Sequence, residues 1–383
     1  MTKQSVLIVG GGLSGLYLAR QLQQQSNEYH IIILESRHRL GGRLESAKVT
    51  FQDGNQDGFD LGGSWFWPSR QPKLTSLIAE LGLESFAQYE QGDLLIERSQ
   101  TRQAQRLDPR DLGMADARRL RGGMRSLIDS LAEQLDPRTI HLGCHVTSIH
   151  LIDSVESEKG ARIQAVCDNG NLFHADTIIL ALPPRLAASG AIFFEPSLPA
   201  ELLSRWSATP TWMAHQAKYV AVYQTPFWRN QHLSGNAHST EGPLGEIHDA
   251  SNFDASAGAL FGFFSIPSQA RLAQSQDQLK AACRAQLSRL FGHQAATPQS
   301  DFLRDWAAEK ATATEADAHM GMASHQGSSE PLPATPDASS SAWHNVVVGA
   351  GSEWSPAFPG YIAGAIDAAE RAFAIICDSC ASA

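Results

Sequence analysis

The sequence has few cysteines and no long apolar run. Its five cysteines are an odd number and lie scattered among 383 residues, as is typical of a reducing compartment. The spacing of Cys377 and Cys380 lacks a redox-fold context and is incidental. No run of about eighteen apolar residues occurs, so we expect no membrane span. A glycine motif begins at Gly10 and leaves no room for a signal peptide. Together these features favour a cytoplasmic protein.

The sequence also has no excess of basic residues. The formal net charge of −10 at pH 7 argues against nucleic acids and anionic membranes as partners. No HExxH motif, zinc-type cysteine spacing, Walker loop or GxSxG elbow occurs, so we expect no metal. With 43% apolar residues, the chain can bury a large core and should form about two domains.

The stretch that organises the chain is its start. Residues 6–9 are typical of a buried strand, residues 10–15 form a glycine-rich turn that opens a helix, and a second strand, 31–34, ends in Glu35. This order of strand, glycine turn, helix and second strand with a terminal acidic residue is the dinucleotide-binding fingerprint. A merely glycine-rich turn is the alternative.

Each position of the fingerprint has a physical role. Gly10 allows the tight turn, Gly12 allows the backbone to approach a pyrophosphate, and Gly15 allows the helix to pack on the sheet. The amides at the helix start, around Leu13 and Ser14, meet the phosphate charge. Glu35 can bind a ribose 2′-hydroxyl.

The residues after Glu35 help to distinguish a flavin dinucleotide from a nicotinamide dinucleotide, a choice that the fingerprint alone leaves open. They carry arginines and a second glycine pair, and the candidate cofactor contacts are Ser36, Arg37, Gly42 and Arg43. Arginine can bind pyrophosphate oxygens in a bidentate manner. A basic, flexible loop is the alternative.

The ExRxRxGGR run over 35–43 resembles that of the flavin amine oxidase family. The same opening occurs in phytoene desaturases and protoporphyrinogen oxidase. The resemblance therefore implies FAD without yet implying an amine.

The segment 60–65 resembles the family's DLGG-x-aromatic segment, which passes the flavin ring. The residues implied are Gly62, Gly63, Ser64 and Trp65. Relatives that oxidise free amino acids place an arginine near here, so Trp65 lowers the expectation of an amino acid substrate. Val146 falls on the strand that brackets the adenine in the family, although a plain core valine is equally compatible.

The strand beginning at Lys218 alternates, which places Lys218, Val220 and Val222 on one face. Lysine rarely enters an apolar face without a partner. A frayed strand end with Lys218 reaching water is the alternative. Family members carry a lysine here, followed by the same Pro-Phe-Trp, and it holds a water against flavin N5. The resemblance implies that Lys218 positions water and assists reoxidation of the flavin by oxygen.

The chain departs from the family after Trp306, which the resemblance places at the flavin. No Cys or Tyr occurs between Trp306 and Trp343. The flavin should therefore be non-covalent, and half of the family's aromatic pair is missing or supplied from elsewhere.

The C-terminal stretch resembles the family's AGTE…GY-x-x-GA ending. It implies that Gly351, Ser352 and Glu353 meet the ribityl and pyrophosphate groups. The helix start faces the pyrimidine end of the flavin, through the segment Gly360, Tyr361 and Ile362. Tyr361 matches the tyrosine that directs an amine toward the flavin. Trp354 is our candidate for the missing aromatic wall.

We expect an α/β fold in which a Rossmann-like FAD-binding domain (1–80, 118–190 and 340–383) is interleaved with an α+β, mixed-sheet substrate domain (81–117 and 191–339). The expected reaction transfers hydride from the carbon next to a neutral amine to flavin N5, giving an imine, and oxygen reoxidises the flavin to yield peroxide. Two alternatives stay open: a desaturase or oxidase of a non-amine substrate, and a non-catalytic FAD-binding partner subunit. The sequence does not identify the amine or the oligomeric state.

Overall fold

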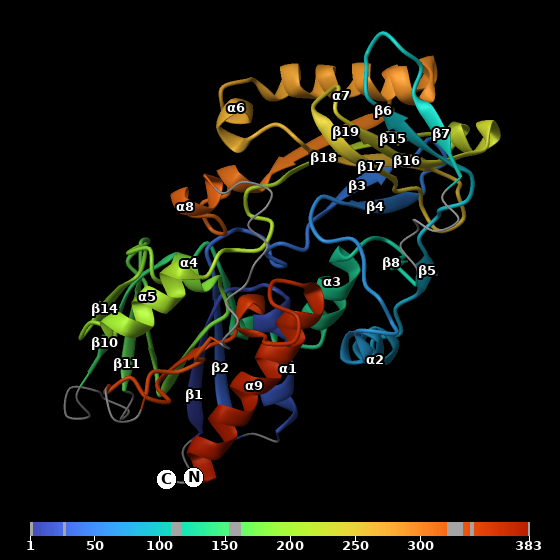
Figure 1. Ribbon diagram of the computed structural model, residues 1–383. Helices are drawn as coiled ribbons and strands as arrows, with labels where there is room; N and C mark the ends of the chain where they lie inside the picture. The colour runs from blue at the N-terminus through green and yellow to red at the C-terminus, as the bar shows by residue number, and fades with distance from the viewer. Residues whose placement is uncertain are drawn as a thin grey trace.

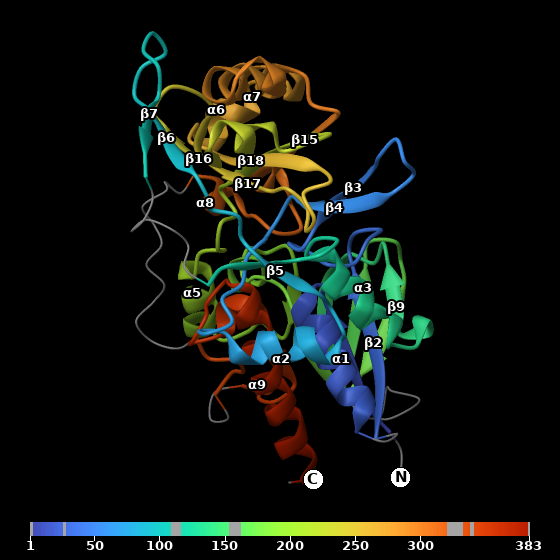
Figure 2. The ribbon, with the colours of Figure 1, turned by 90° about the vertical axis from the view of Figure 1, so that its right-hand side faces the viewer.

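The computed structural model describes residues 3–25, 28–108, 116–152, 162–319, 332–337 and 341–381. Figures 1 and 2 show a lower body built on two sheets and an upper body built on a third. The chain crosses between them several times, as expected for interleaved domains.

The centre of the lower body is a five-stranded parallel sheet. In spatial order its strands are β20 (Val347–Gly349), β13 (Thr177–Leu180), β1 (Gln4–Val9), β2 (Tyr29–Glu35) and β9 (Ile140–Leu142). Four helices pack beside it: α1 (Leu13–Gln24), α2 (Pro72–Glu80), α3 (Arg125–Glu133) and α9 (Ile362–Ala381). Parallel strands that are covered on both faces are typically continuous apolar runs, as residues 6–9 of β1 are.

A second sheet covers the opposite face. Its order is β12 (Leu172–Ala175), β11 (Ile163–Cys167), β10 (Val146–Leu151) and β14 (Phe193–Glu195). One apolar cluster joins the two sheets and includes Leu7, Ile178 and Ile149, together with Leu202 and Trp206 of α5 (Ala200–Ala208). Thus β14 and α5, although expected in the substrate domain, pack with the nucleotide-binding sheets.

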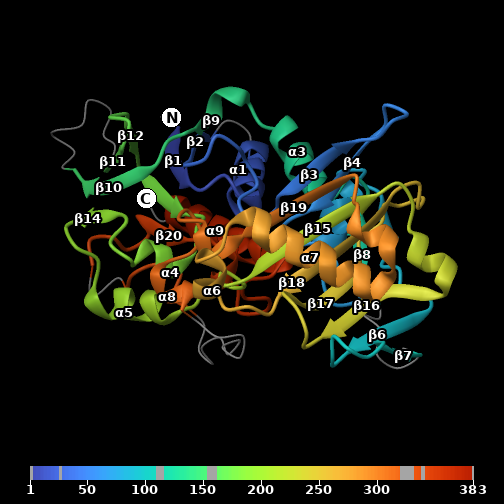
Figure 3. The ribbon, with the colours of Figure 1, turned by 90° about the horizontal axis from the view of Figure 1, so that it is seen from above.

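The upper body is a seven-stranded mixed sheet (Figure 3). Its order is β19 (Ser300–Asp305), β15 (Ala217–Tyr223), β18 (Gly258–Phe264), β17 (Leu244–Asp249), β16 (Leu233–Ser239), β6 (Asp93–Glu97) and β7 (Gln105–Leu107). Helix α7 (Gln276–Phe291) packs on the face that carries Tyr219 and Ala221. The other face carries Val220 and Val222 and packs in part on the hairpin of β3 (Ser46–Thr50) and β4 (Gln56–Asp60).

Short elements complete the described chain. They are β5 (Ser85–Ala87), β8 (Arg118–Leu120), α4 (Pro184–Ala187), α6 (Ser268–Leu272), α8 (Glu315–Ala318), and the 3-10 turns η1 (Pro137–Thr139), η2 (Phe227–Gln231), η3 (His293–Ala296), η4 (Trp306–Ala308) and η5 (Ser352–Trp354). Across the described ranges, no helix has the length and apolarity that crossing a membrane requires. Cys377 carries a free thiol, whereas the side chain of Cys380 lies outside the described residues.

Candidate active site

A cavity of about 1120 Å³ extends from the glycine turn after β1 to the face of the seven-stranded sheet that carries Lys218. This volume exceeds the usual upper bound of about 1,000 Å³ for one drug-sized ligand. The carboxyl ends of β1 and β2 open into it, where ligands of open α/β sheets bind. Of the residues predicted to bind the cofactor, those that line the cavity are Gly10, Gly12, Leu13, Ser14, Glu35, Ser36, Arg37, Gly42, Arg43, Gly62, Gly63, Ser64, Trp65, Val146, Trp306, Gly351, Ser352, Gly360, Tyr361 and Ile362.

The glycine turn shows why three of its positions lack side chains. Gly10 has φ +115°, a region that side-chain-bearing residues rarely adopt. A Cβ on Gly15 would overlap the carbonyl of Gly10, so Gly15 allows α1 to pack on β1 rather than lining the cavity. A Cβ on Gly12 would have no protein atom closer than 4.0 Å. The space beside Gly12 is therefore kept for something other than protein.

Glu35 is fixed where β2 enters the cavity. Its Oε2 accepts a hydrogen bond from the Gly11 amide at 2.8 Å, and its Oε1 accepts one from the Arg37 amide at 2.9 Å. The side chain is buried and lines the cavity. A carboxylate held by backbone amides at the end of this strand is placed to accept hydrogen bonds from a ribose.

Arg43 and Glu353 form a bidentate pair at the junction of the two bodies. Arg43 Nη1 and Nη2 donate to the two carboxylate oxygens at 2.6 and 2.9 Å, and Nη2 also donates to Ser352 Oγ at 2.8 Å. The Glu353 side chain is 3% exposed. Although burial opposes it, the Arg43 guanidinium holds the pKa of Glu353 below its usual value. Glu353 does not line the cavity but orients Arg43, which does.

We expect Arg43→Met to lower the free energy of unfolding by about 3 kcal/mol at neutral pH, because it leaves the buried Glu353 carboxylate unpaired. The folded pKa of Glu353 lies below the unfolded value. The pair therefore stabilises the fold above the unfolded pKa of about 4.3, and this contribution is lost as the pH falls through the folded pKa. Urea unfolding at a series of pH values measures both effects. A difference between variant and wild type that stays constant down to acid pH would contradict this account.

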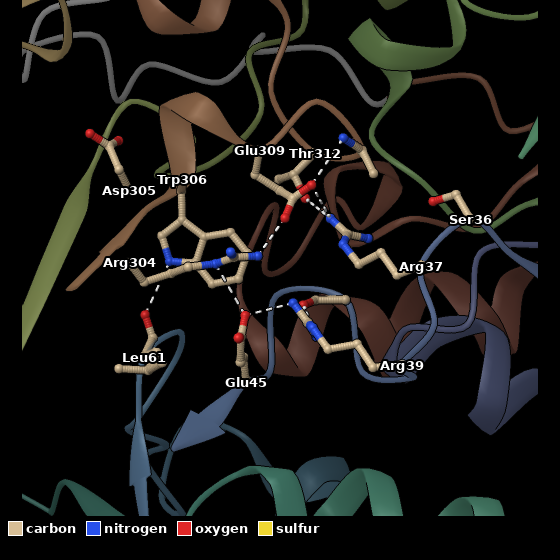
Figure 4. A network of polar contacts seen from close by, with 12 residues as sticks. Ser36, Arg37, Arg39, Glu45, Leu61, Arg304, Asp305, Trp306, Glu309 and Thr312 are labelled. Carbon is tan, nitrogen blue, oxygen red and sulfur yellow. Dashed lines mark hydrogen bonds and ion pairs between the residues drawn. The ribbon is translucent and has the colours of Figure 1, made fainter. Parts of the chain in front are cut away.

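A second network joins the loop after β2 to the segment after β19 (Figure 4). Glu45 pairs with Arg39 and Arg304, and Glu309 pairs with Arg37 and Arg304. The Arg304 guanidinium lies 4.8 Å from the ring centre of Trp306, whose indole N–H donates to the Leu61 carbonyl at 3.1 Å. The network thus fixes Trp306 in the cavity wall.

Lys218 points into the cavity from β15, and its side chain does not reach bulk water. The residue is 2% exposed. Its Nζ donates to Ser64 Oγ at 2.6 Å and to the Gly62 carbonyl at 3.1 Å, and it lies 3.9 Å from the ring centre of Phe261. Burial lowers the pKa of Lys218 to about 7. The frayed-end alternative is therefore wrong, and the amine lies beside the glycines predicted to contact a flavin.

The aromatic partner of Tyr361 is Trp212, which the sequence analysis missed. The two rings stack with centroids 5.2 Å apart and planes inclined by 28°, and both line the cavity. Trp212 packs against the Cα of Gly360, where φ is +81° and a Cβ would overlap the indole. In the sequence, Gly360 directly before Tyr361 signals a close contact at this position. It does not identify the contacting residue, because Trp212 lies on a loop far away in the chain.

Trp354 does not form the predicted wall. It is 2% exposed, meets Trp206 edge-on at 5.5 Å and donates its indole N–H to the Pro333 carbonyl at 3.2 Å. It belongs to the apolar cluster between the two lower sheets. Gly349 makes room for its indole there, because a Cβ would overlap the ring. Burial of this large apolar side chain in the core directs it away from the cavity.

These residues fit a dinucleotide with an attached planar ring. The open space beside Gly12, the helix start and the fixed Glu35 suit the phosphates and ribose. The backbone of Gly62 and Gly63, with Trp306 beside it, can lie against a flat ring system. Lys218, which bonds the Gly62 carbonyl, and the stacked pair of Trp212 and Tyr361 line the same cavity.

Comparisons with known proteins agree with this geometry. A model of the family described as flavin containing amine oxidoreductase matches residues 93–376, and one described as NAD(P)-binding Rossmann-like domain matches residues 8–81. The probable flavin-containing monoamine oxidase A of Dictyostelium discoideum is 24% identical, over 81% of this chain and 85% of that protein. The putrescine oxidase of Kocuria rosea is also 24% identical, over 69% of this chain and 73% of that protein.

Solved structures share the fold. The cyclohexylamine oxidase from Brevibacterium oxydans aligns with a TM-score of 0.76 at 20% identity, over 99% of this chain and 100% of that one. A wild-type putrescine oxidase bound to putrescine aligns with a TM-score of 0.74 at 21% identity, over 98% and 99% of the two chains. The chain therefore has the α/β architecture of these oxidases, including the predicted Rossmann-like domain.

Proposed function

The chain belongs to the family of flavin-containing amine oxidoreductases, and on that premise we propose that it oxidises the carbon next to a neutral amine beside Lys218. It is an FAD-dependent oxidoreductase that acts on amines. The finer chemistry is hydride transfer that converts the amine to an imine, with oxygen as the final acceptor and hydrogen peroxide as the product. Bound FAD supplies the hydride acceptor, and the protein supplies binding, orientation and exclusion of water.

The glycine turn and its neighbours hold the cofactor in this proposal. The start of α1 and Arg43 bind the pyrophosphate, Glu35 binds the adenosine ribose, and Val146 brackets the adenine. Cys144 lines the cavity beside Val146, and its amide donates to the Glu35 carbonyl at 2.9 Å, at the end of the cavity where the ribose binds in this proposal. With no cysteine between Trp306 and Trp343 in the sequence, the flavin is held without a covalent bond. Acid precipitation should therefore release it into the supernatant.

Lys218 holds a water molecule next to the reacting centre. An ammonium group has three donors, and the bonds to Ser64 and the Gly62 carbonyl use two of them. The third is left for water. A pKa of about 7 lets the amine exchange a proton near neutral pH, which suits a group that assists the reaction of the reduced enzyme with oxygen.

Trp212 and Tyr361 form the two aromatic faces past which the amine reaches the flavin. We expect Trp212→Ala to lower kcat/KM for amines by about 10- to 100-fold, because substrate orientation is lost, while the FAD content is unchanged. Phe253→Ala removes an aromatic ring that is 53% exposed, away from the cavity, and should leave kcat/KM unchanged. If Trp212→Ala retains full kcat/KM, the aromatic pair has no role in orientation.

One observation carries the proposal: a single cavity connects the dinucleotide turn to a buried lysine and a stacked aromatic pair. The test is to incubate the purified protein aerobically with primary amines, secondary amines and amino acids and to quantify peroxide, oxygen uptake and amine loss. Equal amounts of peroxide formed and amine consumed are expected for one amine class. Turnover without peroxide would show that another acceptor replaces oxygen.

Two further expectations remain proposals. The FAD-binding part comprises 1–80, 118–190 and 340–383, extended by β14 and α5, and the rest forms the substrate part. A cytoplasmic location is supported by the buried free thiols of Cys144, Cys167 and Cys283, which suit a reducing compartment.

A further inference from the structure

Four cavity-lining residues lie in one row across the upper sheet. Lys218 on β15 pairs in register with Phe263 on β18, Phe263 pairs with Glu246 on β17, and Glu246 pairs with His238 on β16. All four line the cavity, and the strands lie side by side (Figure 3). Neighbouring strands are about 4.8 Å apart, so the backbones of Lys218 and Glu246 are separated by about 10 Å.

Lys218 and Glu246, the two residues of this row that flank Phe263, differ in charge and exposure. Lys218 is buried against Ser64 and Phe261. The side chain of Glu246, in contrast, is 47% exposed and is open to a ligand in the cavity. Phe263 lies between them and offers an apolar surface. This sequence of cation, apolar surface and anion suits a ligand with a reactive neutral end, an apolar spacer and a distal positive charge.

Glu246 is held in place from behind by two polar side chains. Its Oε1 lies 2.8 Å from His248 Nε2, and His248 Nδ1 lies 3.1 Å from Asn236 Oδ1. The His248 ring packs between Trp65, at 4.9 Å, and Phe261, at 5.2 Å. Because Nδ1 faces the Asn236 oxygen, the ring donates through both nitrogens and holds Glu246 Oε1, while Oε2 has no partner among the described residues and is left for a ligand. The hydrogen bond from His248 also lowers the pKa of Glu246.

We propose that Glu246, positioned by His248 and Asn236, is a distal anionic subsite that binds a second ammonium group of the substrate. The preferred substrates are then α,ω-diamines or longer polyamines rather than monoamines. One amine reacts near Lys218, and the other pairs with Glu246 about two strand spacings away. This inference rests on the proposed amine oxidation and adds the substrate class to it.

The test compares α,ω-diaminoalkanes of increasing length with n-alkylamines of the same length, using Glu246→Gln. In the wild type, kcat/KM should favour the diamine over its matched monoamine by about 100-fold at the best length, because only the diamine has a second ammonium group that pairs with Glu246. Glu246→Gln should lower kcat/KM for the diamine by about 100-fold, mainly through KM, and leave the monoamine within about threefold. Glu201→Gln, an exposed acid on α5, is the matched control and should change neither value.

A binding measurement separates the subsite from effects on turnover. Calorimetric titration of the anaerobically reduced protein, which cannot oxidise the ligand, should give a Kd for the best diamine that rises about 100-fold in Glu246→Gln. His248→Ala should give a smaller rise, because it leaves the carboxylate in place but unoriented. Equal losses for diamines and monoamines, or no loss for either, would overturn the subsite. Absence of oxidation of any amine by the wild type would instead contradict the proposed function.

Discussion

Replacing Gly12 by alanine is expected to weaken FAD binding strongly while leaving the apoprotein folded. The added methyl group has no protein atom within less than 4.0 Å, and Gly12 has an extended backbone with φ −81° that alanine adopts without strain. The space that it fills is the approach of the pyrophosphate to the helix start. We expect the Kd for FAD to rise by at least about 100-fold, the equivalent of losing about 2.7 kcal/mol. Calorimetric titration of the apoprotein with FAD measures this change.

The matched control is Gly15→Ala, one helical turn away. There the methyl group would overlap the Gly10 carbonyl and lie 3.1 Å from Ile8 Cγ2. This variant should therefore lose thermal stability as well as FAD affinity, whereas Gly12→Ala should keep the melting temperature of the wild-type apoprotein. Normal FAD affinity in Gly12→Ala would show that the pyrophosphate does not pass this turn.

Lys218→Met is expected to slow the oxygen-dependent half of the reaction on the order of 100-fold. Methionine is similarly long and apolar but holds no water. Reduction of the bound flavin by the amine under anaerobic conditions should change less. Stopped-flow measurements of each half-reaction separate the two rates, and Lys48→Met, an exposed lysine on β3, serves as the control. An unchanged rate with oxygen would remove Lys218 from the proposed role.

The same variant should change how stability depends on pH. The folded pKa of Lys218, about 7, lies below the unfolded value of about 10.4. Between these values the unfolded chain binds more protons, so the wild type gains stability as the pH rises from about 7 to about 10. This difference between the folded and unfolded pKa values of Lys218 corresponds to a gain in stability of about 4 kcal/mol over the whole pH window. Lys218→Met should lack this gain, and parallel stability curves for the two proteins would contradict the buried, weakly basic lysine.

The nucleotide-binding part of the site could be predicted from local sequence. Gly10, Gly12 and Gly15 act within one turn, and Glu35 follows at the end of the next strand. The side-chain alternation around Lys218 is likewise local, and the structure separates Val220 and Val222 from Tyr219 and Ala221 onto opposite faces, as expected. These features depend on near neighbours, whose geometry the chain dictates directly.

The substrate side depends on contacts between distant segments, which the sequence pattern does not contain. Trp212 meets Tyr361 across 149 positions of the chain, and Glu246 joins Lys218 only through the register of three strands. Trp354 illustrates the opposite error. Its place next to a cofactor motif suggested that its ring forms an aromatic wall of the cavity. The indole instead points into the core between the two lower sheets, where its burial stabilises the fold.

The most direct test of the account is anaerobic titration of the purified protein with amines while its visible spectrum is recorded. We predict a yellow protein whose flavin absorbance bleaches with one amine class, returns on admission of air, and appears in the supernatant after acid precipitation. A yellow protein that no amine bleaches would contradict amine oxidation. A colourless protein that FAD cannot reconstitute would contradict the cofactor site itself.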